Sequence, residues 1–276
     1  MADVSPAAVK ALRERTGLPM MDCKKALEAA AGDMEGAVVW LREHGAAKMT
    51  KMQDRPTGFG RMGIYASLTG KAGAMVELQC ESAPVSGNEE FAQLAKDLAQ
   101  QLATGPGAAT PEELLTQPSP SKKGMTLGQQ RDDLFNRIRE NFNLSRIVRL
   151  EGGTCGYEHP GTLVHGVLIQ AKGTNEEAAR NICMHIAAMK PQALTKEEVD
   201  AAAVAKEREF QLEQARKEGK PENILEKMVE GRMRNFFAER VLLEQPYVKD
   251  DKQSVSKYAQ GQGLTLEKYV HWVLGQ

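Results

Sequence analysis

Two cysteine–histidine pairs, each close together in the sequence, are the residues whose side chains could bind a metal or catalyse a reaction. Three residues separate Cys155 from His159, and one residue separates Cys183 from His185. Thiolate and imidazole groups can ligate Zn²⁺, and a histidine can activate a cysteine as a nucleophile. A closed zinc site needs four ligands, and neither pair has a second ligand pair nearby. We therefore expect no metal site and no catalytic residue, with Cys183 and His185 on a helix in or beside the core.

The sequence also lacks the motifs that bind nucleotides through a phosphate-binding loop. No G-x-x-x-x-G-K-[ST] string and no H-E-x-x-H string occurs. Glycines between residues 58 and 63 are better interpreted as turn and strand-breaking residues of a β-hairpin. We expect no cofactor, and a protein that is not an enzyme but acts through its surface.

The charge balance argues against nucleic acid as a direct partner. Lys and Arg total 36 and Asp and Glu total 37, whereas binding through phosphates needs a basic surplus. The four cysteines form no C-x-x-C pair, the first residues carry no signal segment, and no apolar run is long enough to span a membrane. These features predict a cytoplasmic protein with reduced thiols and no membrane contact.

Residues 1–55 predict three short helices. Ser5 before Pro6 is typical of a helix start, and this helix should end at Gly17. Asp22 is expected to cap a second helix. A third should run from Asp33 to Gly45, where glycine favours termination.

The next part of the chain contains one pattern twice. Residues 63–80 and 155–171 each predict a β-hairpin. Each is followed by an Asn-Glu-Glu helix start, at Asn88 and at Asn175, with apolar residues at helical spacing behind it. We interpret this as an internal duplication of two α+β halves.

The remaining segment predicts a helical hairpin and a final strand. Thr195 to Glu198 has the Thr-x-x-Glu form of a capping box before a helix that reaches about Lys217, and Pro221 can begin a second helix. The aromatic and β-branched run at residues 269–274 should complete the second sheet.

Several of these stretches resemble bacterial elongation factor Ts. The specific part is the string from Met20 to Leu27, preceded by Leu12-Arg13 and Thr16-Gly17. Further stretches in the same order lie at residues 45–48, 139–141, 150–152, 184–191, 226–233 and 243–250. The resemblance therefore covers almost the whole chain.

The resemblance implies an α+β fold with five parts. These are a ubiquitin-associated-like three-helix module, two halves of a duplicated core with two small antiparallel sheets, a projecting antiparallel helical hairpin, and a C-terminal segment that completes the second half. Their expected limits are residues 1–55, 56–140, 141–194, 195–240 and 241–276.

The resemblance also implies a function, the exchange of GDP for GTP on elongation factor Tu. It allows a homodimer within a complex of two copies of each protein. The positions that match the family's contacts in the first module are Arg13, Met20 and Met21. A solvated arginine and methionines packed in the core are the alternatives, although methionine also suits adaptable interfaces. His159 matches a histidine that contacts the GTPase, and its alternative is a histidine that only shapes a turn.

One segment departs from the family's sequence. A Thr-Asp-Phe-Val segment, whose Asp-Phe pair wedges between two helices of the partner, normally follows the first hairpin. This chain has Ser82, Ala83, Pro84 and Val85 there, so the carboxylate and the ring are missing. Pro84 can bury less apolar area. We expect weaker or slower exchange, or compensation by other contacts, and the alternative is a protein that holds elongation factor Tu without exchanging its nucleotide.

Overall fold

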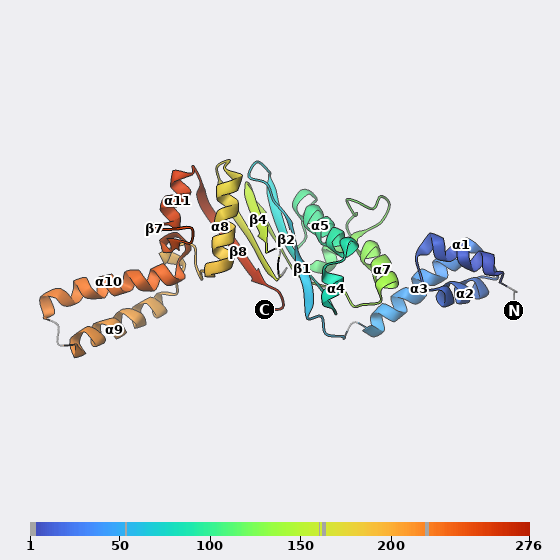
Figure 1. Ribbon diagram of the computed structural model, residues 1–276, viewed down its shortest axis with the longest axis horizontal. Coiled ribbons are helices and arrows are strands. Elements are labelled where there is room, and N and C mark those ends of the chain that lie inside the picture. The colour runs from blue at the N-terminus through green and yellow to red at the C-terminus, as the bar shows by residue number, and fades with distance from the viewer. Residues whose placement is uncertain (1–3, 53, 160, 162–163, 219–220) are drawn as a thin grey trace. The chain divides into compact units, whose positions relative to one another are not determined.

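A computed structural model describes residues 4–52, 54–159, 161, 164–218 and 221–276 (Figure 1). They form helices and small antiparallel sheets, so the predicted α+β class is confirmed. Among the described helices, none combines the length and the apolar character that a bilayer crossing requires. The chain divides into two compact units: Met1–Tyr65 with Ala74–Arg149 and Leu274–Gln276, and Ala66–Gly73 with Leu150–Val273.

Three helices begin the first unit, as the sequence predicts: α1 (Pro6–Thr16), α2 (Met20–Ala29) and α3 (Met34–Met52). The Ser5 hydroxyl accepts a hydrogen bond from the Ala8 amide at 3.2 Å, and Gly17 ends α1 with a φ of +67°, a value that suits glycine. Leu12, Leu27 and Leu41 are buried between the helices. This small apolar core holds the three-helix bundle together.

Two predicted limits of these helices are wrong. α2 begins at Met20 after Pro19, and Asp22 does not cap it because its carboxylate binds Arg139. α3 does not end at Gly45 but continues to Met52. A Cβ added at Gly45 would lie 2.1 Å from Oδ1 of Asn136, so the glycine permits close packing and not termination.

The first sheet has the order β1-β2-β3, with β1 (Phe59–Tyr65), β2 (Ala72–Cys80) and β3 (Asn143–Glu151). β1 and β2 are antiparallel, which confirms the first hairpin. β3 belongs to this sheet, although the predicted boundary after residue 140 assigns it to the second half. The register of a strand depends on its neighbours, and the sequence pattern does not show them.

Four helices accompany this sheet: α4 (Ala83–Ser86), α5 (Glu89–Thr104), α6 (Pro111–Leu115) and α7 (Leu127–Ile138). Asn88 caps α5 by accepting from the amides of Glu90 and Phe91. The apolar face of α5 is fully buried, as its helical spacing predicts. α5 therefore anchors the core of the first unit.

The second sheet has the order β4-β5-β8, with β4 (Thr154–Glu158), β5 (His165–Lys172) and β8 (Thr265–Val273). The antiparallel β4–β5 pair confirms the second hairpin, and β8 completes the sheet as expected. α8 (Glu176–Met189) packs on this sheet and buries Ile182 and Ile186 (Figure 1). Met189, the last residue of α8, is 44% exposed.

The predicted helical hairpin is present in the second unit as α9 (Ala201–Lys217) and α10 (Glu222–Arg240), which extend side by side (Figure 1). The predicted capping box is wrong. Residues 196–198 form one 3₁₀ turn, Glu198 accepts from the Leu194 amide at 2.7 Å, and Asp200 caps α9 instead. The remaining elements of this unit are a 3₁₀ turn (Leu242–Glu244), β6 (Pro246–Tyr247), β7 (Asp250–Ser254) and α11 (Val255–Gly261).

Substitution of Gly63, with Gly231 as the control, tests how closely the first sheet and α5 pack. A Cβ added at Gly63 in β1 would lie 2.0 Å from the carbonyl oxygen of Ala95, whereas one at Gly231 in α10 would meet nothing within 4 Å. Gly63→Ala should lower the free energy of unfolding by about 1–3 kcal/mol, because the backbone must move apart. Gly231→Ala should raise it by about 0.5–1 kcal/mol. Urea denaturation measures both, and equal effects of the two substitutions would contradict the close packing.

Candidate partner-binding surface

The predicted contact residues of the first module lie on the surface. Met20 and Met21, in the first turn of α2, are 51% and 61% exposed, and Arg13 on α1 is also exposed. The interpretation of the methionines as core residues is therefore wrong. Two adjacent exposed methionines form a flexible apolar surface suited to binding. Their contact with a partner stays a prediction.

The segment in place of the family's wedge is short and exposed. Ser82 precedes the four-residue helix α4, in which Ala83 and Pro84 face solvent and Val85 packs against the core of the first unit. The thiol of Cys80 donates to the carbonyl oxygen of Ser82 at 3.3 Å. Burial raises the pKa of Cys80 to about 12, so this thiol keeps the proton that it donates.

Glu140 fixes the start of this segment. Its carboxylate accepts from the Ser82 amide at 3.1 Å and from the Ser82 hydroxyl at 2.5 Å. Next to it, the Asn141 amide donates to the carboxylate of Glu81 at 2.7 Å. Hydrogen bonds to a charged group are stronger than neutral ones. The chain around Ser82 is therefore held at two consecutive residues.

The residue before Glu140 reaches the first module. Arg139 ends α7 with a φ of +68°, and its guanidinium pairs with the carboxylate of Asp22, with both side chains partly buried. We call residues 139–141 the anchor segment. Asp22 directly follows Met21, and Ser82 directly precedes Ala83, so the anchor segment positions both groups of predicted contact residues in this unit. The predicted site did not include the anchor segment, although residues 139–141 are among the stretches that carry the family resemblance. Arg139 and Asp22 are 117 positions apart, and no local pattern reveals their pairing.

His159 belongs to the second unit, immediately after β4. Its amide donates to the carbonyl oxygen of His165 at 3.0 Å, and its Nδ1 accepts from the Gly161 amide at 3.2 Å. Burial, followed by the charges of Lys190 and His159, lowers the pKa of His165. His159 thus has the bonds of a turn histidine and remains partly exposed, and its role as a contact stays a prediction.

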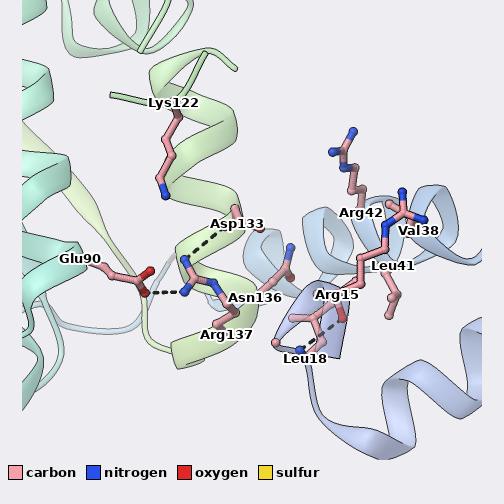
Figure 2. A pocket seen from close by; sticks show the side chains of 12 residues that line it. Arg15, Leu18, Val38, Leu41, Arg42, Glu90, Lys122, Asp133, Asn136 and Arg137 are labelled. Atoms are coloured by element: carbon pink, nitrogen blue, oxygen red, sulfur yellow. Dashed lines mark hydrogen bonds and ion pairs between the residues drawn. The ribbon is translucent and has the colours of Figure 1, made fainter. Parts of the chain in front are cut away.

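A polar cleft of about 420 Å³ lies in the first unit among α1, α3 and α7. Figure 2 shows Arg137 paired with Glu90 and Asp133 on one side and Arg15 on the other. Arg42 and Lys122 also line it, so basic side chains outnumber acidic ones. None of the predicted contact residues lines this cleft.

The cysteine and histidine pairs do not form a metal centre. Among the described residues, no group of three or more His, Cys, Asp and Glu side chains could hold a metal ion. His185 is buried on α8, with Nε2 2.9 Å from Oε1 of Gln245 and Nδ1 accepting from the Val248 amide at 3.2 Å. Both ring nitrogens therefore have structural partners. The exposed residues 20, 21, 83 and 84, next to chain held by the anchor segment, are typical of a protein that acts by binding.

Comparison with known proteins assigns the family. A family model described as "Elongation factor TS" matches residues 81–276. Elongation factor Ts of Methylococcus capsulatus is 41% identical over 276 residues, which cover 99% of this chain and 92% of the relative. The proteins of the same name from Hyphomonas neptunium and Azoarcus sp. are 40% and 39% identical, cover the whole of this chain, and are covered to 93% and 92%. The chain belongs to the elongation factor Ts family, as its sequence motifs indicated.

Removing the Glu140 carboxylate tests the anchor segment. Glu140→Ala should free the Ser82 amide and hydroxyl, and a hydrogen bond to a charged group contributes about 1.5–3 kcal/mol. Hydrogen exchange of the amides in residues 82–87 should become about tenfold faster or more, because local opening becomes easier. Glu43→Ala removes an exposed carboxylate from α3 and serves as the control. Unchanged exchange at residues 82–87 in Glu140→Ala would show that the segment is held by other contacts.

Proposed function

We propose that the chain is a guanine-nucleotide exchange factor that binds elongation factor Tu in complex with GDP and promotes the release of GDP during translation elongation. The observation that carries the proposal is the full-length relationship to elongation factors Ts, which covers 99–100% of this chain in the relatives named above. The exposed Met20 and Met21 support it. The proposal includes a cytoplasmic location and no direct contact with nucleic acid.

The mechanism is a coupling of two binding equilibria and needs no bond-making residue. A factor that binds the nucleotide-free GTPase more tightly than the GDP-bound form weakens GDP by the same ratio. A ratio of about 10⁴ corresponds to roughly 5.5 kcal/mol of differential binding. An interface of ordinary size can supply this free energy when its side chains are held in place beforehand. The anchor segment supplies such preorganisation on the first unit.

The proposed contacts are Arg13, Met20 and Met21 in the first module, residues 82–85, and His159. In this proposal the methionines bind the nucleotide-binding domain of the GTPase. Residues 82–85 and His159 contact the regions that hold Mg²⁺ and phosphate. Pro84 replaces the aromatic ring of the usual wedge with a smaller apolar surface.

The proposal extends to the architecture. The three N-terminal helices form a ubiquitin-associated-like module, and the core arose by duplication. In support, two of the described sheets have three strands, and the hairpin of each, β1–β2 and β4–β5, precedes a helix with an asparagine N-cap, Asn88 for α5 and Asn175 for α8. The five predicted segments, with β3 counted in the first half of the core, and a homodimer within a complex of two copies of each protein belong to the same proposal.

A holder of elongation factor Tu that does not exchange nucleotide is the second candidate. It is favoured by one observation: the exposed residues of α4 are Ala83 and Pro84, which carry neither a carboxylate nor a ring. Release of a fluorescent GDP from elongation factor Tu of the same organism separates the candidates. Faster release with catalytic amounts of this protein supports exchange, whereas stable binding without acceleration supports the holder.

The methionine pair gives a sharper prediction in this assay. Burial of one methionine side chain contributes about 1.5–3 kcal/mol, so Met20→Ala/Met21→Ala should slow catalysed GDP release about tenfold or more. Val39→Ala is the matched control, because Val39 is 54% exposed on α3 of the same module. Val39→Ala should leave the rate unchanged. A double variant as active as the unmodified protein would remove the methionines from the proposed contact.

Restoring the wedge tests residues 82–85. Ala83→Asp/Pro84→Phe should accelerate GDP release about tenfold, because it returns the carboxylate and a large apolar side chain that gains burial free energy. Ala83→Asn/Pro84→Leu provides an uncharged control without a ring and should accelerate it less. If the Ala83→Asp/Pro84→Phe variant promotes GDP release no faster than the unmodified protein, the partner has changed to accommodate the present segment.

A further inference from the structure

Two cysteines lie against each other in the second unit, outside the proposed contact surface. Cys155 is on β4 and Cys183 is on α8, which packs against that strand. Sγ of Cys183 donates to the carbonyl oxygen of Cys155 at 3.6 Å, and Cys155 packs against the apolar cluster that contains Cys183. The fold thus joins two thiols that are 28 residues apart in the chain.

The surroundings make the two thiols unequal. Cys155 is partly exposed, while Cys183 is completely buried in the apolar core. The adjacent Cys183 thiol, helped by the Gly156 backbone and the charge of Arg180, lowers the pKa of Cys155 against the opposing effects of burial and Glu176. Burial, with the neighbouring Cys155, raises the pKa of Cys183 well above its ordinary value. Since the thiolate is the reactive form, Cys155 is the nucleophile of the pair and Cys183 retains its proton.

We propose that Cys155 and Cys183 form an oxidation site that converts a peroxide signal into an intramolecular disulfide. In the first step, Cys155 sulfur attacks one oxygen of hydrogen peroxide, the O–O bond breaks, and water leaves. Sulfur is oxidised to sulfenic acid and the peroxide is reduced. In the second step, Cys183 sulfur attacks Cys155, an S–S bond forms, and the S–O bond breaks. The Cys183 proton leaves with the oxygen as a second water.

The position of Cys183 explains why the disulfide forms within one chain. Its sulfur has no exposed surface, so it is shielded from solvent peroxide and from a second molecule, but it already contacts Cys155. Cellular dithiol reductants can reverse the reaction.

The other two cysteines provide an internal comparison. Cys23 and Cys80 are both buried, and their sulfurs donate to the carbonyl oxygens of Leu18 and Ser82. Burial raises the pKa of Cys80 to about 12, so little thiolate is available there. We expect neither to react at peroxide concentrations that oxidise Cys155.

Peptide mapping of the full-length protein after treatment with one equivalent of hydrogen peroxide tests the proposal. The expected product is one intramolecular link between the peptides that carry residues 155 and 183, with a loss of two hydrogen masses. Two of the four thiols should no longer react with an alkylating reagent, and both should react again after reduction with dithiothreitol. Sulfinic acid at Cys155 without a link, a link between two chains, or earlier oxidation of Cys23 or Cys80 would each overturn it.

Three variants separate the steps by the same mass readout. Cys183→Ala should stop at the sulfenic acid on Cys155, which dimedone traps, and Cys155→Ser should form no link. Cys80→Ser should form the link as the unmodified chain does. These readouts do not involve elongation factor Tu, so failure of this proposal is distinguishable from failure of the proposed exchange activity.

Discussion

The hydrogen bonds from Ser82 to the Glu140 carboxylate are the interaction on which the proposed contact surface of the first unit depends. An isolated helix of four residues is not stable in water, so α4 keeps its shape because contacts from outside the helix fix it. Glu140 fixes its beginning, and the half-buried Val85 fixes its middle. The neighbouring Arg139 extends the same support to α2 through Asp22. One short segment therefore orients two groups of side chains that are far apart in the chain.

This support matters because the proposed activity has no reactive group to depend on. An exchange factor weakens a bound nucleotide only by the free energy with which it prefers the empty GTPase. Side chains that must be ordered during binding use up part of that free energy, and those already held in place do not. The buried His185 and the core around α8 are structural, and the proposed contacts are exposed residues next to anchored ones.

Local patterns were sufficient to predict most elements. The caps at Ser5 and Asn88 and the apolar face of α5 are confirmed, because each depends on residues within one or two turns. The contacts of the anchor segment could not be predicted, since its partners are 58 to 117 positions away in the sequence. Gly45 was misinterpreted for a related reason: its packing against Asn136 is a tertiary requirement that resembles a local stop signal.

The most direct test of the central claim compares two affinities of this protein for elongation factor Tu of the same organism. Titration calorimetry should measure its dissociation constant for the nucleotide-free GTPase and for the GDP-bound form at one Mg²⁺ concentration. The nucleotide-free form should bind more tightly by orders of magnitude, and the same ratio should describe the loss of GDP affinity in the complex. Equal affinities for the two forms would contradict it.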